Sequence, residues 1–407
     1  MLIRYKQDTK GKSVPFAKIY TPAEHHINPD SIDKDAYWAV RKLQNSGAEA
    51  YLVGGAVRDL LLGLVPKDFD ITTSASPRQI QRMFWNARII GRRFKLVHLV
   101  FGDKIIECST FRSGEMAEDG SNNVFGSVDQ DAKRRDFSIN SLYYNPVNGQ
   151  LLDFNNAMAD FRKRRITSII PLDQSFVEDP VRMVRALKYS VTTGFRLRLD
   201  ICMAIRKYAS ELGRVSTSRL TEETNKILSS GHSYEIFKAL ERYRLLVYML
   251  PCFSIYCKYP EVKKSLAVLD RKVMDAKNGK GAEVSLSEQI KYLVQPMVVL
   301  AGKEEMTSDE RFHEVYRQIK VLVNPMTPPN YEVEGAVRAI LSEQGYKIPR
   351  TKNRVVKQNR PQARGGQRRG APVRRNRKRA GGGAKQASVP VTAQAATPQT
   401  SAEAHDL

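Results

Sequence analysis

Short strands that alternate with short helices are predicted by the order of hydrophobic and polar positions between residues 49 and 111. A Gly54-Gly55 turn separates the first strand from a short helix at residues 56–62. The predicted strands are residues 49–53, 68–71, 95–101 and 104–111. This alternation indicates an α/β or α+β unit with a small mixed sheet.

Helices are predicted before and within this unit. Residues 31–46 carry apolar side chains at helical spacing. Ser76 and Gln79 stand on either side of Pro77 in the pattern of a capping box, which marks another helix start. Residues 1–30 are polar and contain prolines, and we expect them to be an extended arm with little structure of its own.

The rest of the chain has different patterns. Residues 114–129 are rich in Gly, Ser, Asn and acidic residues, which predicts a mobile loop. From Asp131 to about Gly345 the apolar spacing is mostly helical and predicts an all-α second half. After Gly345 the apolar residues thin out, so no core could offset the ordering entropy and a disordered tail is expected.

The predicted fold class is α+β, with an N-terminal head built on a small mixed sheet, an all-α neck and body, and a disordered basic tail. A chain of 407 residues can hold two or three compact units, because single cores seldom grow beyond about 250 residues. The predicted domains are the arm at 1–30, the head at 31–170, the neck at 171–255, the body at 256–346 and the tail at 347–407.

A strong positive charge makes a polyanion the expected partner. The chain has 66 Lys+Arg against 43 Asp+Glu, a formal net charge of +23. Residues 347–385 hold 15 of these cations and no acidic residue, and two acidic residues follow later in the tail. Without the tail, residues 1–346 still carry a net charge of +10. Nucleic acid is therefore favoured, although lipid headgroups remain an alternative partner for the tail.

The four cysteines and six histidines show no spacing typical of a zinc site or a disulfide framework. No run of 18 apolar residues occurs in the sequence, and charge follows the first residues where a signal peptide would have its apolar core. We therefore expect a soluble, cytoplasmic protein without stable membrane insertion.

Asp68 and Asp70 are two residues apart on a predicted strand, so their side chains project from one face while Phe69 points to the other. Such a pair can hold the two cations, about 3.5–4 Å apart, that phosphoryl and nucleotidyl transfer use. Their oxygen ligands suit Mg²⁺. Taken alone, an Asp-x-Asp pair is more often a solvated strand edge.

The preceding Gly54-Gly55 turn makes the metal interpretation more specific. Its bare backbone can approach phosphates, and the N-terminus of the helix that follows favours an anion. Glu107 lies between apolar neighbours on a predicted strand and is a candidate third carboxylate. The alternative for Glu107 is a strand residue in a salt bridge.

A helix is predicted to open in residues 134–140, where Asp136 and Asn140 would share one face. Arg135 could bind a phosphate while the Asp and Asn side chains bond a sugar hydroxyl. The alternative is an ordinary charged helix start.

Asp179 is predicted to cap a helix whose first residue is Pro180. Arg182 and Arg185 would then line one helix face and could contact a base edge or a phosphate.

Two basic segments could bind RNA. Arg92, Arg93 and Lys95 surround Phe94 beside the predicted metal site, which fits stacking and phosphate contact, or alternatively a charged hairpin edge that resists aggregation. The tail could bind phosphates without folding, or could only aid solubility. Its densest cations are Arg374, Arg375, Arg377, Lys378 and Arg379.

With these motifs the chain resembles the class II polymerase-β-type nucleotidyltransferases, the group of bacterial poly(A) polymerases and CCA-adding enzymes. The matching runs occur in the family's order and spacing, and the resemblance covers residues 31–190 before fading towards 250. The runs are LVGGAVRDLLLGLVPKDFD (52–70), RRDFSINSLYY (134–144) and EDPVRMVRALKYS (178–190).

The resemblance implies a nucleotidyltransferase head and a helical neck that binds nucleotide and RNA, followed by a helical body. RNA binding by the body is inferred only from its helical pattern and its charge. It implies that Asp68, Asp70 and Glu107 are catalytic, with Asp68 and Asp70 as ligands of two Mg²⁺ ions that Mn²⁺ could replace. The residues it implies in nucleotide binding are Gly54, Gly55, Arg58, Arg135, Asp136, Asn140, Asp179, Arg182 and Arg185.

Two stretches, GRRFKLVHLVF (91–101) and HHINPDSID (25–33), are similar to segments of the bacterial poly(A) polymerases. The predicted activity is therefore template-independent addition of AMP from ATP to single-stranded RNA 3′ ends. CCA addition to tRNA and a non-catalytic RNA-binding role are the alternatives. RNA decay nucleases or RNA chaperones are the expected protein partners.

Overall fold

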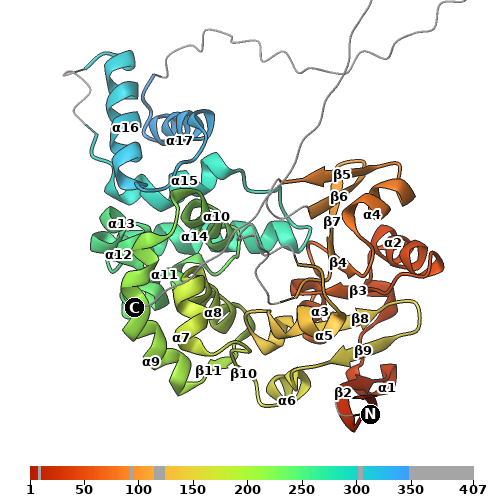
Figure 1. The fold of residues 1–407 in the computed structure, drawn as a ribbon. Helices are drawn as coiled ribbons and strands as arrows, with labels where there is room; N and C mark the ends of the chain where they lie inside the picture. The colour runs from red at the N-terminus through yellow and green to blue at the C-terminus, as the bar shows by residue number, and fades with distance from the viewer. Residues whose placement is uncertain (8–10, 92–95, 114–123, 301–305, 348–407) are drawn as a thin grey trace, which may run out of the picture. The chain divides into compact units, whose positions relative to one another are not determined.

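The computed structural model describes residues 1–7, 11–91, 96–113, 124–300 and 306–347 (Figure 1). All of these residues belong to one compact unit. Apart from Lys347, the predicted disordered tail lies outside the described residues. The boundaries proposed between arm, head, neck and body remain predictions.

A nine-stranded mixed sheet occupies the first part of the chain, in the order β1-β2-β9-β8-β3-β4-β7-β6-β5 (Figure 1). The pairing of β4 with β7 is parallel, and the other pairings are antiparallel. The strands are β1 (Leu2–Gln7), β2 (Ser13–Tyr20), β3 (Ala50–Val53), β4 (Asp70–Thr73), β5 (Ala87–Ile90), β6 (Leu96–Phe101), β7 (Lys104–Thr110), β8 (Leu142–Asn145) and β9 (Gln150–Asp153).

Helices cover one face of this sheet because their apolar side chains recur at helical spacing. In α2, Ala36, Val40 and Leu43 are buried against Leu52 and Ile71 of the sheet within one core cluster. Burying a large aliphatic side chain of this kind contributes about 1.5–3 kcal/mol. The helices on this face are α2 (Lys34–Asn45), α3 (Gly55–Leu61), α4 (Pro77–Met83) and α6 (Ala157–Arg162).

Helix α5 (Val128–Lys133) covers part of the opposite face. Its Val128 and Ala132 pack on Tyr51, Val53 and Tyr143 in a smaller core cluster. Further along the same face, Ile105 and Glu107 of β7 and Arg88 of β5 are exposed. One half of this face is thus covered by a helix, whereas side chains of β7 and β5 in the other half are exposed.

The remainder of the described chain is almost entirely helical and has its own core (Figure 1). Its helices are α7 (Leu172–Glu178), α8 (Val181–Thr193), α9 (Leu199–Tyr208), α10 (Thr217–Leu228), α11 (Ser233–Arg242), α12 (Leu246–Met249), α13 (Pro251–Tyr256), α14 (Pro260–Lys277), α15 (Leu286–Val294), α16 (Ser308–Leu322) and α17 (Asn330–Glu343). Short 3₁₀ turns and a parallel pair, β10 (Arg165–Ile166) with β11 (Arg196–Leu197), connect them. The predicted α+β class is confirmed.

Three local predictions are wrong. Residues 1–30 contain β1, β2 and the helix α1 (Pro22–His25), and β2 joins the sheet through β9. The helical pattern predicted from Asp131 onward is interrupted by β8 and β9, whose side chains are buried on both faces and therefore do not alternate. Residues 134–140 form a turn and a 3₁₀ helix (Ser138–Asn140) in place of the expected helix.

The predicted loop at residues 114–129 is described only from residue 124 on, and α5 already begins at Val128. Among the helices that the structure describes, none has both the length and the apolar character needed to cross a bilayer.

Candidate active site

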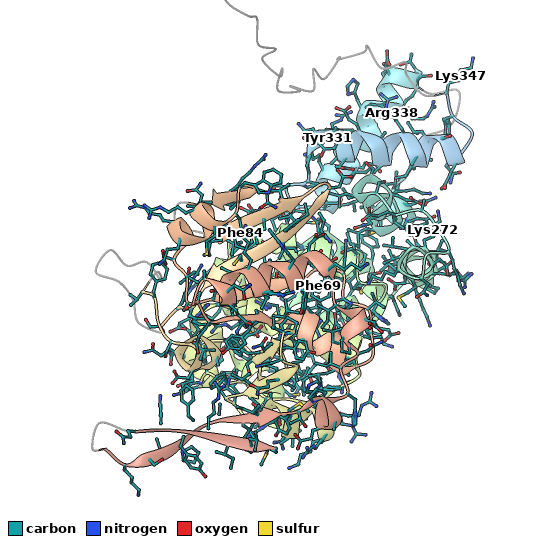
Figure 2. All side chains as sticks on the ribbon, turned by 90° about the vertical axis from the view of Figure 1, so that its right-hand side faces the viewer. Phe69, Phe84, Lys272, Tyr331, Arg338 and Lys347 are labelled. Carbon is teal, nitrogen blue, oxygen red and sulfur yellow. The ribbon has the colours of Figure 1, made fainter. Side chains whose placement is uncertain are left out.

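Asp70 is the first residue of β4, and Asp68 precedes the strand by two residues, so the prediction that both lie on one strand is wrong for Asp68. The neighbours of Asp70 in sequence, Phe69 and Ile71, are buried in the core beneath α2 and α3. Figure 2 labels Phe69 among these side chains. Because side chains alternate along an extended chain, Asp70 faces the opposite side of the sheet, the side that also carries its register partner Glu107.

The turn before α3 brings a carboxylate and a guanidinium together. Gly54 has φ +72°, and a Cβ placed on it would lie 3.6 Å from Asp70 Oδ2 and 3.9 Å from Arg135 Nη1. A side chain here would be strained and would fill the space between the two charged groups. Glycine therefore keeps the backbone accessible beside both of them.

Asp70 lies in an acidic environment. Burial, the charge of Glu107 and the charge of Asp68 raise its pKa to about 6, against the opposing effects of Arg135 and Lys226. Glu107 is the register partner of Asp70 on β7. A divalent cation relieves such repulsion between carboxylates, and the oxygen donors of Asp68 and Asp70 fit Mg²⁺ or Mn²⁺.

Among the described residues, Glu107 is not part of a cluster of three metal-ligating side chains. Its exposed side chain lies 3.7 Å from His98 Nε2. Within the part of the chain that the structure describes, no three His, Cys, Asp or Glu side chains are grouped closely enough to hold a metal ion. His98 is thus the neighbour of Glu107, and both the salt bridge and the role of Glu107 as a third ligand stay predictions.

Arg135 is held rigidly beside Asp70. Its Nε donates to the Tyr143 hydroxyl over 2.9 Å, and its Nη2 lies 3.1 Å from Asp131 Oδ2. The Tyr143 hydroxyl also donates to Asp131 over 2.7 Å. Burial alone would raise the pKa of Asp131, but Arg135 and Arg134 lower it below its ordinary value. Sequence analysis missed Asp131 and Tyr143, although Asp131 stands one helical turn before Arg135.

Asp136 and Asn140 come together without the predicted helix. Asn140 Nδ2 donates to Asp136 Oδ1 over 3.3 Å, and Arg58 Nη1 donates to Asn140 Oδ1 over 3.0 Å. Asp136 Oδ2 lies 2.9 Å from Arg185 Nη2, across the junction with α8. These predicted nucleotide-binding residues therefore form one connected network.

Tyr189 of α8 is a contact point for this network. The guanidinium of Arg58 lies 5.0 Å from the centre of its ring. Arg185 donates to its hydroxyl through Nη2 over 3.0 Å and Nε over 3.3 Å. Sequence analysis did not select Tyr189, which lies one turn after Arg185 and could have been found from that spacing.

Asp179 does not cap α8, which corrects the prediction. Helix α8 begins at Val181 with no side-chain cap, and Asp179 Oδ2 accepts a hydrogen bond from Arg219 Nη2 of α10 over 2.9 Å. Arg182 donates to Ser175 through Nη1. The guanidiniums of Arg182 and Arg185 thus have different partners.

Helix α10 contributes residues that sequence analysis missed. Lys226 is close enough to Asp70 to lower its pKa. Glu223 accepts a 2.6 Å hydrogen bond from Lys188 of α8, and both side chains are buried. No motif links α10 to Asp68 and Asp70, so only the folded chain reveals this proximity.

The predicted RNA-binding residues of the β5–β6 connection and of the tail lie outside the described residues. They are Arg92, Arg93, Lys95, Arg374, Arg375, Arg377, Lys378 and Arg379.

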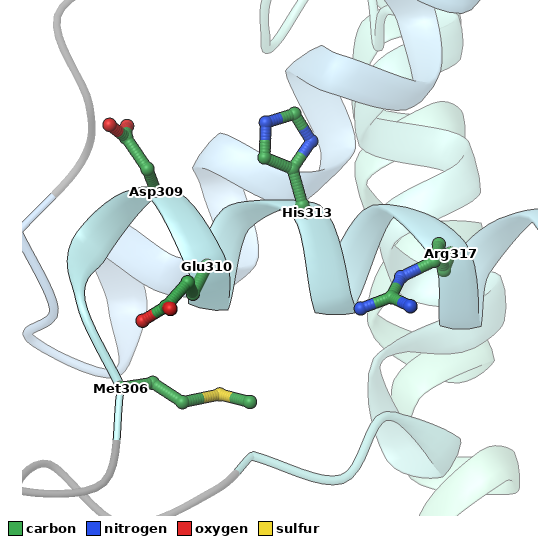
Figure 3. A pocket seen from close by; sticks show the side chains of 5 residues that line it. All are labelled: Met306, Asp309, Glu310, His313 and Arg317. Atoms are coloured by element: carbon green, nitrogen blue, oxygen red, sulfur yellow. The ribbon is translucent and has the colours of Figure 1, made fainter.

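A hollow at the start of α16 is not the candidate site, because no predicted site residue lines it (Figure 3). Glu310 there accepts hydrogen bonds from Thr307 as part of a capping box. The residues around the hollow are Met306, Asp309, Glu310, His313 and Arg317.

An α+β head with paired carboxylates beside a glycine turn is the arrangement that the predicted nucleotidyltransferase head requires. Residues 50–167 match the family model described as "Poly A polymerase head domain". Residues 194–256 match the model described as "Probable RNA and SrmB- binding site of polymerase A". In these two segments the chain is similar to bacterial poly(A) polymerases and CCA-adding enzymes.

Poly(A) polymerases and CCA-adding enzymes are both similar in sequence to this chain. It is 38% identical over 256 residues to "Poly(A) polymerase I" of Escherichia coli O6:H1, which covers 60% of this chain and 55% of that protein. It is 34% identical over 203 residues to the "CCA-adding enzyme" of Lactobacillus helveticus, covering 49% of this chain and 51% of that one. The chain thus spans about half the length of the curated relatives it matches.

A solved structure shares the fold. It is the Bacillus stearothermophilus CCA-adding enzyme in complex with CTP, at TM-score 0.50 and 23% identity, covering 77% of this chain and 83% of that one.

Proposed function

We propose that this chain adds nucleotides to RNA 3′ ends without a template and that its reaction is the transfer of AMP from ATP with release of pyrophosphate. The observation that carries the proposal is the approach of Asp70 and Arg135 to the glycine turn, within 3.6 and 3.9 Å of a Cβ built on Gly54. At this turn the carboxylate of Asp70, which would bind metal, and the guanidinium of Arg135, which would bind phosphate, lie beside accessible backbone.

Asp68 and Asp70 would hold two Mg²⁺ ions, which when bound lower the pKa of the attacking hydroxyl and neutralise charge on the leaving pyrophosphate. The backbone at Gly54 and Gly55 lets the triphosphate approach closely. Arg135, fixed by Asp131 and Tyr143, provides a positive charge that need not reorganise during the reaction. The RNA 3′-hydroxyl attacks the α-phosphate in line, and positioning supplies much of the rate.

Residues from the head and from α8 would select the nucleotide. Asp136 and Asn140 would bond the ribose, and Arg58 and Arg185 are held at this position by their own contacts. Asp179 and Arg182 would recognise the base, with Arg219 holding the Asp179 carboxylate. Protein groups thus replace a template strand.

CCA addition to tRNA is the second candidate, and the 34% identity to a CCA-adding enzyme supports it. The poly(A) assignment rests on the similarity of residues 25–33 and 91–101 to bacterial poly(A) polymerases and on the net charge of +23, which suits RNA of any sequence. ATP and single-stranded RNA ends are the proposed substrates. A cytoplasmic location and decay-related protein partners remain predictions.

Individual nucleoside triphosphates distinguish the two activities. Purified protein is incubated with Mg²⁺, a generic single-stranded RNA or a tRNA lacking its 3′ end, and one triphosphate at a time. Long extension of the generic RNA with ATP alone is the expected result. Incorporation of CTP confined to the tRNA would establish CCA addition, and no incorporation with any substrate would favour a non-catalytic RNA-binding protein.

A further inference from the structure

The proposed nucleotide-binding residues occupy one side of Asp70 along the sheet, and three further strands occupy the other. The Gly54-Gly55 turn follows β3, and Tyr143, whose hydroxyl holds Arg135, belongs to β8. In the strand order, β3 and β8 lie on one side of β4, and β7, β6 and β5 lie on the other (Figure 1). The sheet therefore extends past Asp70 in a direction that the nucleotide-binding residues do not use.

Polar side chains follow one another from Asp70 across these three strands. Glu107 of β7 is the register partner of Asp70 and also of His98 on β6. His98 is in turn the register partner of Arg88 on β5. Register partners place their side chains on the same face of a sheet, so these four side chains form a row on the face of Asp70. We call them the Asp70 row.

The far members of the Asp70 row are accessible. Ala87 and Ile89 pack against the core cluster on the other face of the sheet, so Arg88 between them faces away from that core and is exposed. Within the part of the chain that the structure describes, Arg88 has no hydrogen-bond or ion-pair partner. The side chain of Glu107 is 52% exposed, and its Oε1 lies 3.7 Å from His98 Nε2.

The geometry of the proposed reaction decides from which side the RNA arrives. Nucleotidyl transfer places the attacking hydroxyl and the leaving pyrophosphate roughly in line, on opposite sides of the α-phosphate. A triphosphate bound at the Gly54 turn and at Arg135 lies on the β3 side of Asp70. The RNA 3′-hydroxyl therefore has to approach Asp70 from the β7 side.

We propose that the last nucleotides of the RNA lie over β7, β6 and β5, with the terminal ribose beside Glu107 and His98 and an upstream phosphate bound by Arg88. This inference rests on the proposed function. Adjacent strands lie about 4.8 Å apart, so Arg88 is roughly 14 Å from Asp70, a distance that a few nucleotides span.

The order of charges along the Asp70 row fits an RNA 3′ end. The terminal ribose carries hydroxyl groups, which can donate hydrogen bonds to a carboxylate such as Glu107. The phosphates begin upstream of that ribose, and Arg88 is the member of the row that can bind a phosphate through two parallel hydrogen bonds. The acidic end of the row thus meets hydroxyls, and its basic end meets phosphate.

Photo-crosslinking tests this path directly. Full-length protein is mixed with Mg²⁺ and a single-stranded RNA whose last nucleotide is 4-thiouridine, without ATP, so that no AMP is added. After irradiation and digestion, cross-links are expected in the tryptic peptides of residues 96–104 and 105–112, which contain His98 and Glu107. Cross-links confined to α8 or α10 would overturn the inference.

Substitution of Arg88 tests the phosphate contact. Arg88→Ala should raise KM for RNA roughly tenfold at low salt and leave KM for ATP unchanged. It should also reduce the slope of log K against log salt by about 0.7, the contribution of one phosphate contact on a single strand. Arg88→Lys keeps the charge and should retain most of the slope. Unchanged RNA affinity in Arg88→Ala, or an equal rise in both KM values, would overturn this role.

Arg82→Ala is the matched control. Arg82 is an exposed cation of α4, and Ile80 of the same helix packs in the core cluster on the other face of the sheet. Its loss should leave KM for RNA and the salt slope unaltered. Equal effects of Arg82→Ala and Arg88→Ala would mean that only overall charge matters, and the proposed path would be wrong.

The two proposals fail in different ways. AMP incorporation by the native protein, together with cross-links only outside residues 96–112, would overturn this inference and leave the proposed function intact. Cross-links within residues 96–112 without AMP incorporation into any RNA would support the RNA contact and overturn the proposed function.

Discussion

The Arg58 guanidinium lies over the ring of Tyr189, 5.0 Å from its centre, and joins α3 of the head to α8 of the helical half. Tyr189 also accepts hydrogen bonds from Arg185, which in turn pairs with Asp136. One side chain therefore positions two arginines that are proposed to contact the nucleotide. Loss of this aromatic ring would remove one contact of each arginine and leave the hydrogen bond of Arg58 to Asn140 and the ion pair of Arg185 with Asp136 in place.

Two substitutions of Tyr189 should weaken ATP binding to different degrees. Tyr189→Phe keeps the ring under Arg58 and loses the hydroxyl, which should raise KM for ATP two- to tenfold, since a net hydrogen bond contributes about 0.5–1.5 kcal/mol. Tyr189→Leu loses both contacts and should raise KM further, with a smaller change in kcat. Steady-state kinetics with varied ATP measures this. Equal KM values for all three proteins would show that Tyr189 only packs.

Gly54 and Gly63 form a matched pair for testing the glycine turn. Both have positive φ, +72° and +70°, but a Cβ at Gly63 would meet nothing within 4 Å. Gly54→Ala and Gly63→Ala should each lower the free energy of unfolding by about 1–3 kcal/mol through backbone strain. Only Gly54→Ala should also lower kcat/KM, because its methyl group enters the space beside Asp70 and Arg135. Comparable activity of the two variants would argue against the turn as a phosphate site.

Asp131 should make the stability of the head depend on acid pH. Its pKa is lowered in the folded chain, where Arg135 and Arg134 outweigh the effect of burial. A depressed pKa contributes stability that is complete above the ordinary value of 3.8. That contribution is lost as pH falls from there through the folded-state pKa.

Urea unfolding between pH 3 and pH 7 measures this effect for the native protein and for Asp131→Asn. We expect the variant to have a lower free energy of unfolding than the native protein at neutral pH. The difference between the two should shrink towards pH 3, and most of this change should fall within about two pH units around the ordinary carboxyl pKa. A difference that does not change with pH would mean that the Asp131 charge does not hold Arg135.

Local signals in the sequence predicted the parts of the site that depend on neighbouring residues. The capping box at Ser76 and Gln79 is present, and Phe69 is buried on the opposite side of the strand from Asp70. These features follow from backbone period and hydrogen-bonding capacity. They need no knowledge of the tertiary fold.

Features that depend on distant packing could not be predicted in this way. Asp179 has the sequence of a helix cap, but Arg219 of α10 takes its carboxylate. Lys226 lowers the pKa of Asp70 across the fold. The strand β8, buried except at Asn145, carries no alternation that would separate it from a helix.

The central claim is that nucleotidyl transfer depends on the carboxylates of Asp68 and Asp70, which would hold the metal ions. Its most direct test is the single-turnover rate of AMP incorporation into a labelled RNA by Asp68→Asn and Asp70→Asn, with melting temperature and RNA affinity as controls. The account predicts that each variant folds and binds RNA but loses incorporation by several orders of magnitude. Incorporation at the native rate by either folded variant would contradict it.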